Sequence, residues 1–305
     1  MKNFEYTVPS TVREAVKLLS ENGTSARALA GGTDLIVQMR AKRHQPDRVV
    51  DVKKIPELNE LSLSPRRGLT IGAAVPCHRI YGDAEIAENY PGIVDAAAII
   101  GGIQIQGRAT FGGNLCNSSP SADSTPMLIA YGAVAEISGP NGKRKVAVED
   151  FCTAPGANVL TAGELLVSIR VPLAKPNSGA HYLRFIPRNE MDIAVVGAGA
   201  YTELGGRGSK RRFKNVRLSL GAVAPTPLFA DQVGPLLEGK EINDEDALEA
   251  VADAAKAIAK PISDMRGPAE YRVHLVGVLT KRALRGAARR ALGEFVPNAV
   301  QKAAE

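Results

Sequence analysis

Two pairs of adjacent glycines, Gly31-Gly32 and Gly112-Gly113, are the residues of this chain best suited to hold a ligand. Glycine lets a loop adopt positive φ and lets the backbone approach a ligand closely. Successive backbone N–H groups in such a loop form a concave nest for an anion, most often a phosphate. Two nests in one chain suit a ligand with two phosphates, so the doublets predict a dinucleotide site.

The residues after the first doublet strengthen this interpretation. Thr33 and Asp34 are favourable N-cap residues, and residues 35–40 form a plausible short helix whose N-terminus would lie beside the anion. The Asp34 carboxylate would repel a phosphate unless it caps this helix. Neither doublet fits G-x-G-x-x-G or G-x-x-x-x-G-K-[ST], so a Rossmann fingerprint and a P-loop are both unsupported.

Length and composition set limits on the class of protein. The 305 residues, 45% of them hydrophobic, suit a globular protein of two domains, or of one domain with a large appendage. No apolar run reaches the roughly 18 residues of a membrane span, and the first ten residues lack the apolar core of a signal peptide, so we expect a cytoplasmic protein. The net charge is +6, but the aromatic residues (5%) do not interleave with a basic stripe, which argues against nucleic-acid binding.

The chain lacks a recognisable set of catalytic or metal-binding side chains. Its three cysteines, Cys77, Cys116 and Cys152, stand far apart without a C-x-x-C pair, which excludes a cysteine-bound iron–sulfur or zinc site. The four histidines show no ligand spacing, and neither G-x-S-x-G nor H-E-x-x-H occurs. We therefore expect no catalytic residue and no metal site, and any chemistry would come from a bound cofactor.

Hydrophobic periodicity predicts a small parallel sheet followed by a mainly antiparallel one. In the first part, strands alternate with helices, and Thr11 and Glu14 form a possible capping box. The predicted strands there are 4–8, 27–30 and 48–52. In the middle part, a helical stretch over 85–100 is broken at Tyr90-Pro91, and Thr125-Pro126 starts another helix. The predicted strands there are 69–75, 133–138, 143–148 and 165–171.

The segment 175–179 is the best linker candidate, and a second domain follows it. Its predicted elements are strands at 182–186, 193–203 and 215–222 and helices at 246–259 and 268–292. The last helix has one basic face, with Lys281, Arg285 and Arg289 at helical spacing and Arg282 beside them. This face is either a solvated surface or a docking surface for a partner subunit.

Several spaced motifs, in the same order along the chain, resemble the FAD-binding medium subunit of molybdenum hydroxylases. This family includes the medium subunit of carbon monoxide dehydrogenase and the FAD domain of xanthine dehydrogenase, and the resemblance covers residues 4–292. The motifs are Ala30-Gly31-Gly32-Thr33-Asp34-Leu35, Arg108-Ala109-Thr110-Phe111-Gly112-Gly113-Asn114, Ser119-Pro120-Ser121-Ala122-Asp123, Met191-Asp192-Ile193-Ala194 and Glu270-Tyr271-Arg272-x-x-Leu275-x-x-Val278-Leu279.

The resemblance implies an α+β fold with two domains. Residues 1–176 would form a FAD-binding domain of the p-cresol methylhydroxylase and vanillyl-alcohol oxidase type, with subdomains at about 1–56 and 57–176. Residues 177–292 would form a C-terminal α+β domain with a three-stranded antiparallel sheet and helices. Residues 293–305 would be a tail.

The resemblance also implies that FAD is held non-covalently between the two glycine loops. Asn114 would donate an amide hydrogen bond, Asp123 would accept one, and Arg184 and Ile193 would lie near the flavin ring. The implied FAD-binding residues are Leu29, Ala30, Gly31, Gly32, Thr33, Asp34, Leu35, Ala109, Thr110, Gly112, Gly113, Asn114, Asp123, Leu165, Leu166, Arg184 and Ile193, with the two leucines of 165–166 on the adenine side. From the residues alone, Asn114 could instead close a turn, Asp123 could cap a helix, the leucines could be strand core, and Arg184 could be a surface charge.

The implied function is electron transfer within a multi-subunit molybdenum hydroxylase. A small [2Fe–2S] subunit would supply electrons, a large subunit would carry molybdopterin, and an external acceptor would take the electrons from FAD, in a dimer of heterotrimers. Residues 115–119 run on without a cysteine-rich insertion, so no [4Fe–4S] cluster is expected. Two alternatives remain open: a free-standing FAD-dependent oxidoreductase of the same fold, and a nucleotide-binding or structural subunit without activity.

Overall fold

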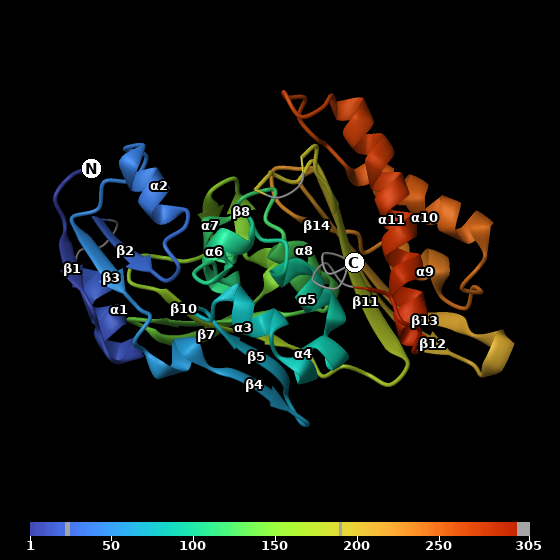
Figure 1. The fold of residues 1–305 in the computed structure, drawn as a ribbon, viewed down its shortest axis with the longest axis horizontal. Helices are drawn as coiled ribbons and strands as arrows, with labels where there is room; N and C mark the ends of the chain where they lie inside the picture. The colour runs from blue at the N-terminus through green and yellow to red at the C-terminus, as the bar shows by residue number, and fades with distance from the viewer. Residues whose placement is uncertain (22–24, 189–190, 298–305) are drawn as a thin grey trace.

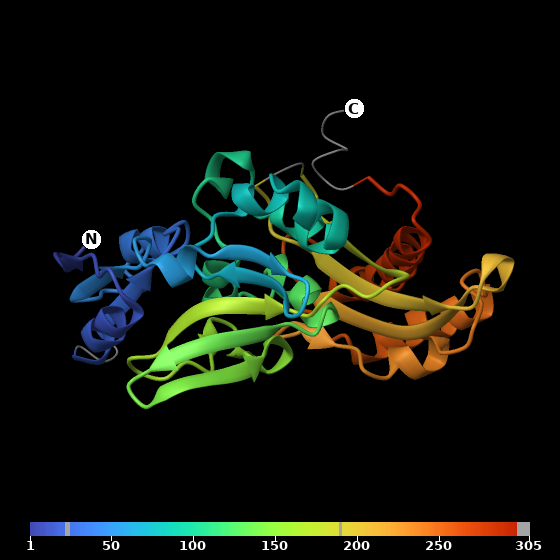
Figure 2. The same ribbon diagram turned by 90° about the horizontal axis from the view of Figure 1, so that it is seen from below.

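The computed structural model describes residues 1–21, 25–188 and 191–297, and its main sheets have three, five and four strands. The three-stranded sheet lies at one end of the elongated molecule, and the four-stranded sheet and the last helices lie at the other (Figures 1 and 2). In the described part of the chain, no helix is both long enough and apolar enough to cross a membrane.

The first sheet is parallel, with strand order β1-β3-β2, which confirms the predicted alternation of strands and helices. Half of the predicted capping box forms at the start of α1, where the Glu14 N–H donates to Thr11 Oγ1 (3.2 Å), while the Glu14 carboxylate accepts from the Ser10 N–H (2.9 Å) and not from that of Thr11. The elements are β1 (Glu5–Thr7), α1 (Val12–Glu21), β2 (Ala26–Leu29), α2 (Leu35–Arg40) and β3 (Arg48–Asp51).

The second sheet is antiparallel, with strand order β4-β5-β10-β6-β7, and the predicted strands 133–138 and 143–148 form a hairpin that turns at Pro140-Asn141. Its central strand β10 has the predicted bounds, whereas β5 ends at Gly72, three residues before the predicted end of that strand. The strands are β4 (Leu61–Ser64), β5 (Gly68–Gly72), β6 (Val134–Gly139), β7 (Gly142–Ala147) and β10 (Leu165–Val171), and a small hairpin pairs β8 (Cys152–Ala154) with β9 (Ala157–Asn158).

Short helices connect these strands. Pro91 cannot continue α4 but can occupy the first turn of α5, so the break predicted at Tyr90-Pro91 is confirmed. The predicted start of α8 at Thr125-Pro126 is wrong, because the helix begins at Ser124 with Asp123 at the N-cap position. The helices are α3 (Cys77–Tyr81), α4 (Ala84–Asn89), α5 (Pro91–Ala97), α6 (Ile103–Gln106), α7 (Phe111–Asn117) and α8 (Ser124–Ala130), with 3-10 turns at η2 (Pro56–Asn59) and η3 (Val148–Asp150).

The third sheet is antiparallel, with strand order β11-β12-β13-β14, which corrects the three-stranded sheet expected from the resemblance. The fourth strand has only two residues, Leu228-Phe229, and pairs with Ser219 and Leu220. A strand this short carries no periodicity of its own, which is why the pattern missed it. The elements are β11 (Ser178–Phe185), β12 (Val196–Gly205), η4 (Gly208–Lys210), β13 (Arg212–Gly221), β14 (Leu228–Phe229), α9 (Val233–Leu237), α10 (Glu245–Ile258) and α11 (Ala269–Ala291).

Helix α11 packs its apolar stripe, including Leu275, Val276 and Leu279, on the third sheet, and α5 and α8 contact strands of the same sheet. The sheet is therefore covered by α11 and by two helices, α5 and α8, that precede it in the chain. Arg217 on β13 continues this contact, since its guanidinium donates to the Ile129 carbonyl at the end of α8 (3.0 Å) and to the Glu149 carboxylate (2.6 Å).

The basic face predicted on the last helix is neutralised by its neighbours. Lys281 pairs with Glu249, and Arg285 pairs with Glu245 (2.6 Å), both of which lie on α10. Arg289 pairs with Glu294 just beyond the helix (2.7 Å). The three side chains remain 26–56% exposed, so they form a solvated face whose cations pair mainly with α10, and a docking role stays a prediction.

Candidate functional site

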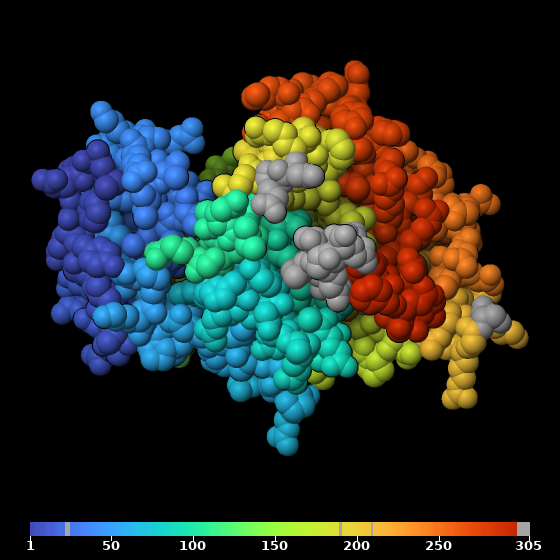
Figure 3. Space-filling view, viewed as in Figure 1, coloured from blue at the N-terminus to red at the C-terminus, as the bar shows by residue number. Residues whose placement is uncertain are grey.

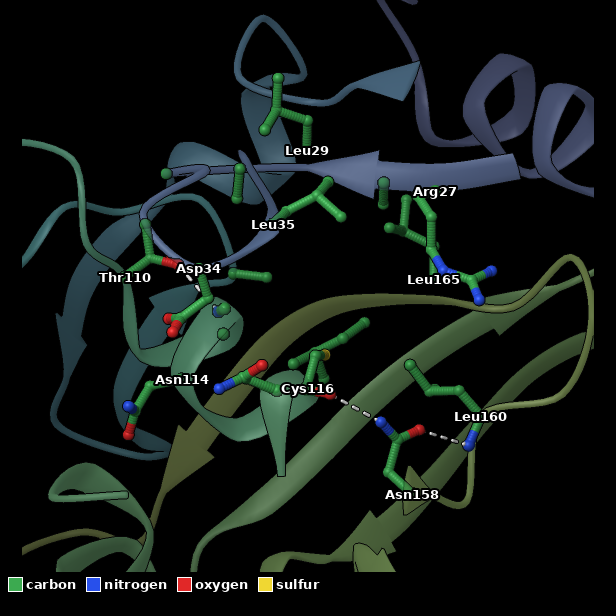
Figure 4. Close-up of a pocket in the computed structure, with 18 of the residues that line it drawn as sticks. Arg27, Leu29, Asp34, Leu35, Thr110, Asn114, Cys116, Asn158, Leu160 and Leu165 are labelled. Atoms are coloured by element: carbon green, nitrogen blue, oxygen red, sulfur yellow. Dashed lines mark hydrogen bonds between the residues drawn. The ribbon is translucent and has the colours of Figure 1, made fainter. Parts of the chain in front are cut away.

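A cleft with a cavity volume of about 720 Å³ lies between the first sheet and the second. The surface is indented there, between the N-terminal lobe (blue) and the rest of the molecule (Figure 3). One wall is the β2–α2 segment, the opposite wall is the start of α7, and the residues that connect β9 to β10 close a third side (Figure 4). Concave sites of this volume are typical for cofactors and small ligands.

Most residues predicted to bind the dinucleotide line this one cleft, although they come from three separate segments of the chain. They are Leu29, Ala30, Gly31, Gly32, Thr33, Asp34, Leu35, Ala109, Thr110, Gly112, Gly113, Asn114, Leu165 and Leu166. Asp123, Arg184 and Ile193 do not line it. The structure therefore brings the two glycine loops together, as their pattern predicts.

The first glycine loop presents a run of free donors to the cleft. Among the described residues, no protein group accepts a hydrogen bond from the backbone N–H groups of Gly31, Gly32, Thr33 or Asp34. Gly32 has φ +77°, a left-handed conformation that favours glycine. Consecutive unpaired N–H groups of this kind form an anion-binding nest.

The second loop adds one further free donor at the start of α7. Thr110 caps this helix, because its Oγ1 accepts from the Gly113 N–H (2.8 Å), and its carbonyl accepts from the Asn114 N–H (2.9 Å). In the described part of the chain, the N–H group of Gly112 has no acceptor. Donors from both loops thus line the same cleft.

The Asn114 side chain has one end committed to the protein and one end available. Its Oδ1 accepts from the Ser124 hydroxyl (2.6 Å) and from the Ser124 N–H (3.3 Å). These bonds orient the side chain, and among the described residues nothing accepts from its Nδ2. This is the arrangement that an amide donor to a ligand requires, and Ser124 is an orienting residue that the sequence did not reveal.

The glycines are also needed for packing between the loops. A Cβ added at Gly31 would lie 2.1 Å from the Arg108 carbonyl oxygen, and one at Gly112 would lie 2.5 Å from the Ala73 carbonyl oxygen. The Arg108 Nε in turn donates to the Gly31 carbonyl (2.9 Å). Glycine at these two positions therefore lets the first loop pack against the Arg108 backbone and the second against the Ala73 backbone. The sequence pattern alone did not indicate these contacts.

Asp34 occupies the N-cap position of α2, but its side chain makes no capping hydrogen bond. The expectation that it caps the helix is therefore wrong for the side chain. Its carboxylate lies in the cleft between the loops (Figure 4), where desolvation raises the pKa of the carboxyl. The reason is that a charge at this position loses hydration without gaining a partner.

We predict that Asp34→Asn tightens binding of a diphosphate ligand. Removing one charge a few ångströms from a diphosphate relieves repulsion on the order of 1 kcal/mol, about fivefold in Kd. Wild-type affinity should fall as the pH rises through the raised pKa of Asp34, and the variant should lack this dependence. Titrations of both proteins across pH check this, and weaker binding by the variant would instead make Asp34 an acceptor for a ligand hydroxyl.

The segment between β9 and β10 contributes lining residues that the sequence analysis missed. Asn158 donates to the Cys116 carbonyl (2.8 Å) and accepts from the Leu160 N–H (3.0 Å), so it fixes this turn against α7 (Figure 4). An Asn that bonds the N–H two residues on is a recognisable turn signal. The Cys116 thiol also lines the cleft, and burial raises its pKa to about 12, which fits a small apolar lining residue.

An ion pair ties the same turn to β7. Arg144 binds the Glu164 carboxylate through Nε (2.6 Å) and Nη2 (2.7 Å), and the Thr161 N–H donates to it (2.8 Å). The Arg144 guanidinium is the main reason that the pKa of Glu164 falls to about 2. Next to it, Leu165 and Leu166 are buried on β10 and still line the cleft, so they serve as strand core and as an apolar wall.

The depressed pKa of Glu164 predicts an acid-dependent loss of stability. A carboxyl with a lowered folded-state pKa stabilises the fold above its unfolded value of about 4.3, and this contribution is lost as the pH falls toward about 2. We expect Glu164→Gln to lower the free energy of unfolding at pH 7 by about 1–2 kcal/mol, with allowance for screening of the half-exposed Arg144. Urea unfolding at pH 7 and pH 3 checks this, because the difference between variant and wild type should shrink at the lower pH.

Asp123 and Arg184 pair with each other outside the cleft. The Arg184 guanidinium lies 2.7 Å from the Asp123 carboxylate, both side chains are buried, and the Tyr182 hydroxyl donates to the same carboxylate (3.0 Å). Burial raises the pKa of Asp123 to about 6, and Arg184 opposes that rise. The Asp123 carboxylate is thus engaged in an ion pair, which explains why it does not cap α8. The third predicted residue outside the cleft, Ile193, is half-exposed and lies just before β12.

A small parallel α/β unit, an antiparallel sheet and two amide-lined loops on opposite walls of one cleft define a dinucleotide-binding protein. Residues 2–174 match the family described as the FAD binding domain in molybdopterin dehydrogenase, and residues 181–287 match the CO dehydrogenase flavoprotein C-terminal domain. The chain belongs to this family of FAD-binding subunits. It is an FAD-binding oxidoreductase subunit of the carbon monoxide dehydrogenase and xanthine dehydrogenase type.

Relatives match over nearly the whole chain. The putative xanthine dehydrogenase FAD-binding subunit XdhB of Escherichia coli is 32% identical over 95% of this chain and 98% of its own length. The carbon monoxide dehydrogenase medium chain of Afipia carboxidovorans is 34% identical over the same shares. Among solved structures, reconstituted CO dehydrogenase from Oligotropha carboxidovorans superposes with a TM-score of 0.89 at 33% identity, covering 94% of this chain and 98% of that one.

Proposed function

We propose that FAD lies non-covalently along the cleft, with its diphosphate between the two glycine loops. The run of unpaired N–H groups from Gly31 to Asp34 is the observation that carries this proposal. The apolar wall of Leu165 and Leu166 suits the adenine end. The flavin end would extend beyond the cleft toward Asp123, Arg184 and Ile193, whose contact with the ring remains a prediction.

We propose that the chain is the electron-transfer subunit of a molybdenum hydroxylase. Bound FAD supplies the ability to accept electrons singly and to release them as a pair. The chain's own residues hold and orient the cofactor: the two loops neutralise the diphosphate, and Asn114 offers an oriented amide donor. The electrons would come from [2Fe–2S] clusters of a small subunit and would pass from FAD to an external acceptor. A large subunit would carry molybdopterin, and the three subunits would assemble as a dimer of heterotrimers. Relatives named as the medium chain of a dehydrogenase support this assignment.

An exposed apolar edge supports assembly with other subunits. The Met191 N–H donates to the Gly101 carbonyl (3.0 Å), and Asp192 lies 3.4 Å from Arg266, so three segments distant in sequence meet there. Exposed apolar patches of this kind mark interaction sites. The exposed apolar side chains on these segments are Ile103, Met191, Ile193, Ile262 and Met265.

The proposed domain division is a FAD-binding domain over 1–176, with p-cresol methylhydroxylase-type subdomains at about 1–56 and 57–176, and a C-terminal domain over 177–292. Within the proposed tail, 293–305, residues 298–305 lie outside the described residues. A cytoplasmic location belongs to the same proposal, and the free thiols of Cys77, Cys116 and Cys152 suit a reducing compartment.

Purification through a tag on this chain from its native host tests the assignment. We expect FAD together with one smaller and one larger subunit, and with iron and molybdenum in the complex. The isolated chain should bind FAD without oxidising organic substrates. A chain that purifies alone and oxidises a substrate without molybdenum would instead be a free-standing flavin oxidoreductase.

A further inference from the structure

One side-chain hydrogen bond crosses the cleft from one wall to the other. Gln38 on α2 donates through Nε2 to Oδ1 of Asn117 on α7, at 2.9 Å, and both residues line the cleft and are partly buried. In the described part of the chain, this is the only side-chain hydrogen bond from α2 to the opposite wall. The two amides thus join walls that belong to different sheets.

The position of this bond follows from helix geometry. Gln38 lies four residues after Asp34, and Asn117 lies four residues after Gly113, so each stands about one turn, roughly 6 Å, beyond its glycine loop. The Arg108 Nε joins the loops themselves by its bond to the Gly31 carbonyl (2.9 Å). The space between the walls is therefore bridged both at the loops and one turn beyond them.

We propose that the bond between Gln38 and Asn117 is a strap that must open before FAD enters or leaves. This inference rests on the proposed FAD site. The bond uses only the two side-chain amides and none of the loop N–H groups that face the ligand, so FAD held by the loops leaves it intact and it stabilises the closed cleft with and without the cofactor. Breaking the bond therefore contributes to the activation barrier for FAD uptake and for FAD release. It does not contribute to the free-energy difference between the free chain and the FAD complex.

The strap predicts an unusual pair of kinetic effects. A hydrogen bond between neutral side chains contributes modestly, so its loss should raise both the association and the dissociation rate of FAD about three- to tenfold. The Kd should change by less than about twofold, because both rates rise together. A residue that contacts FAD directly would instead raise the Kd through the dissociation rate alone.

The test uses the full-length chain and stopped-flow flavin fluorescence. Uptake is followed by mixing FAD with the apoprotein, and release by dilution into an excess of apoprotein trap. The variants are Gln38→Ala, Asn117→Ala, the double variant, and Gln38→Met, which keeps the length and helix propensity of glutamine. Because both single variants break the same bond, the double variant should be no faster than either. Gln104→Ala, on the exposed side of α6 and outside the cleft, is the matched control and should behave as wild type.

The possible outcomes distinguish failure of the strap proposal from failure of the proposed FAD site. Faster uptake and release with an unchanged Kd support the strap. Wild-type rates in Gln38→Ala and Gln38→Met, or a raised Kd with unchanged association, overturn it while leaving FAD binding intact. Failure of the wild-type chain to bind FAD would overturn the proposed function itself.

Discussion

Replacing Gly31 with alanine will raise the Kd for FAD by about 100-fold. The new Cβ would lie 2.1 Å from the Arg108 carbonyl oxygen and 2.8 Å from its carbon, a contact with backbone that no side-chain rotation relieves. The β2–α2 loop must therefore move away from α7, which separates the two sets of N–H donors. Overpacking of this kind costs about 1–3 kcal/mol, and here the bound state bears that cost because it needs both loops in register. Fluorescence titration of the variant with FAD measures the loss.

Gly107→Ala is the matched control for this experiment. Gly107 lies in the loop just before Arg108, has φ −67°, and has no atom within 4 Å of an added Cβ. The same chemical change, a few residues away, should therefore leave FAD binding at the wild-type level. If Gly31→Ala also binds FAD normally, the contact between the two loops does not hold the site together.

Replacing Arg290 with alanine will lower the free energy of unfolding by about 3–5 kcal/mol. The Arg290 guanidinium on α11 binds both oxygens of Asp95 on α5, at 2.6 and 3.0 Å, and both side chains are about 95% buried. The variant leaves the Asp95 charge buried without its cation, which is the costly way to break such a pair. The same guanidinium donates to the Ala180 carbonyl (2.7 Å), so the loss also loosens β11.

Guanidinium chloride unfolding of three further proteins checks this prediction. Arg282→Ala, on the exposed side of the same helix, should change the free energy of unfolding by less than about 0.5 kcal/mol. The double variant Arg290→Met and Asp95→Asn should regain part of the loss, because neither buried charge remains. A loss below about 1 kcal/mol in Arg290→Ala would mean that this ion pair does not hold α11 against α5.

Local pattern was sufficient to find the loops and many of the elements around the cleft. The short helix after Gly31-Gly32 and the strand 165–171 have the predicted bounds, because the helix follows the glycine doublet and the strand ends just before Pro172. The glycine doublets were likewise sufficient to predict the anion-binding nests, because free N–H groups in a loop depend only on the local backbone conformation. What such patterns report is the conformation and burial of one segment, not the identity of its partner.

Partners far apart in the sequence were therefore the part that could not be predicted. Nothing local to Asp123 indicates that Arg184 neutralises it, and nothing local to Gln38 points to Asn117. The acidic partners of the basic face of α11 could not be predicted for the same reason, because they lie on α10. Asp34 was expected to cap α2 on residue type alone, whereas the backbone leaves its carboxylate free in the cleft.

The most direct test of the account is the uptake of FAD by the purified chain. Equilibrium dialysis and visible absorbance should show a yellow protein with one FAD per chain, and ADP should compete because it offers the same diphosphate and adenine. A folded chain that stays colourless and takes up no added FAD would contradict the assignment of the cleft between the glycine loops as a flavin site.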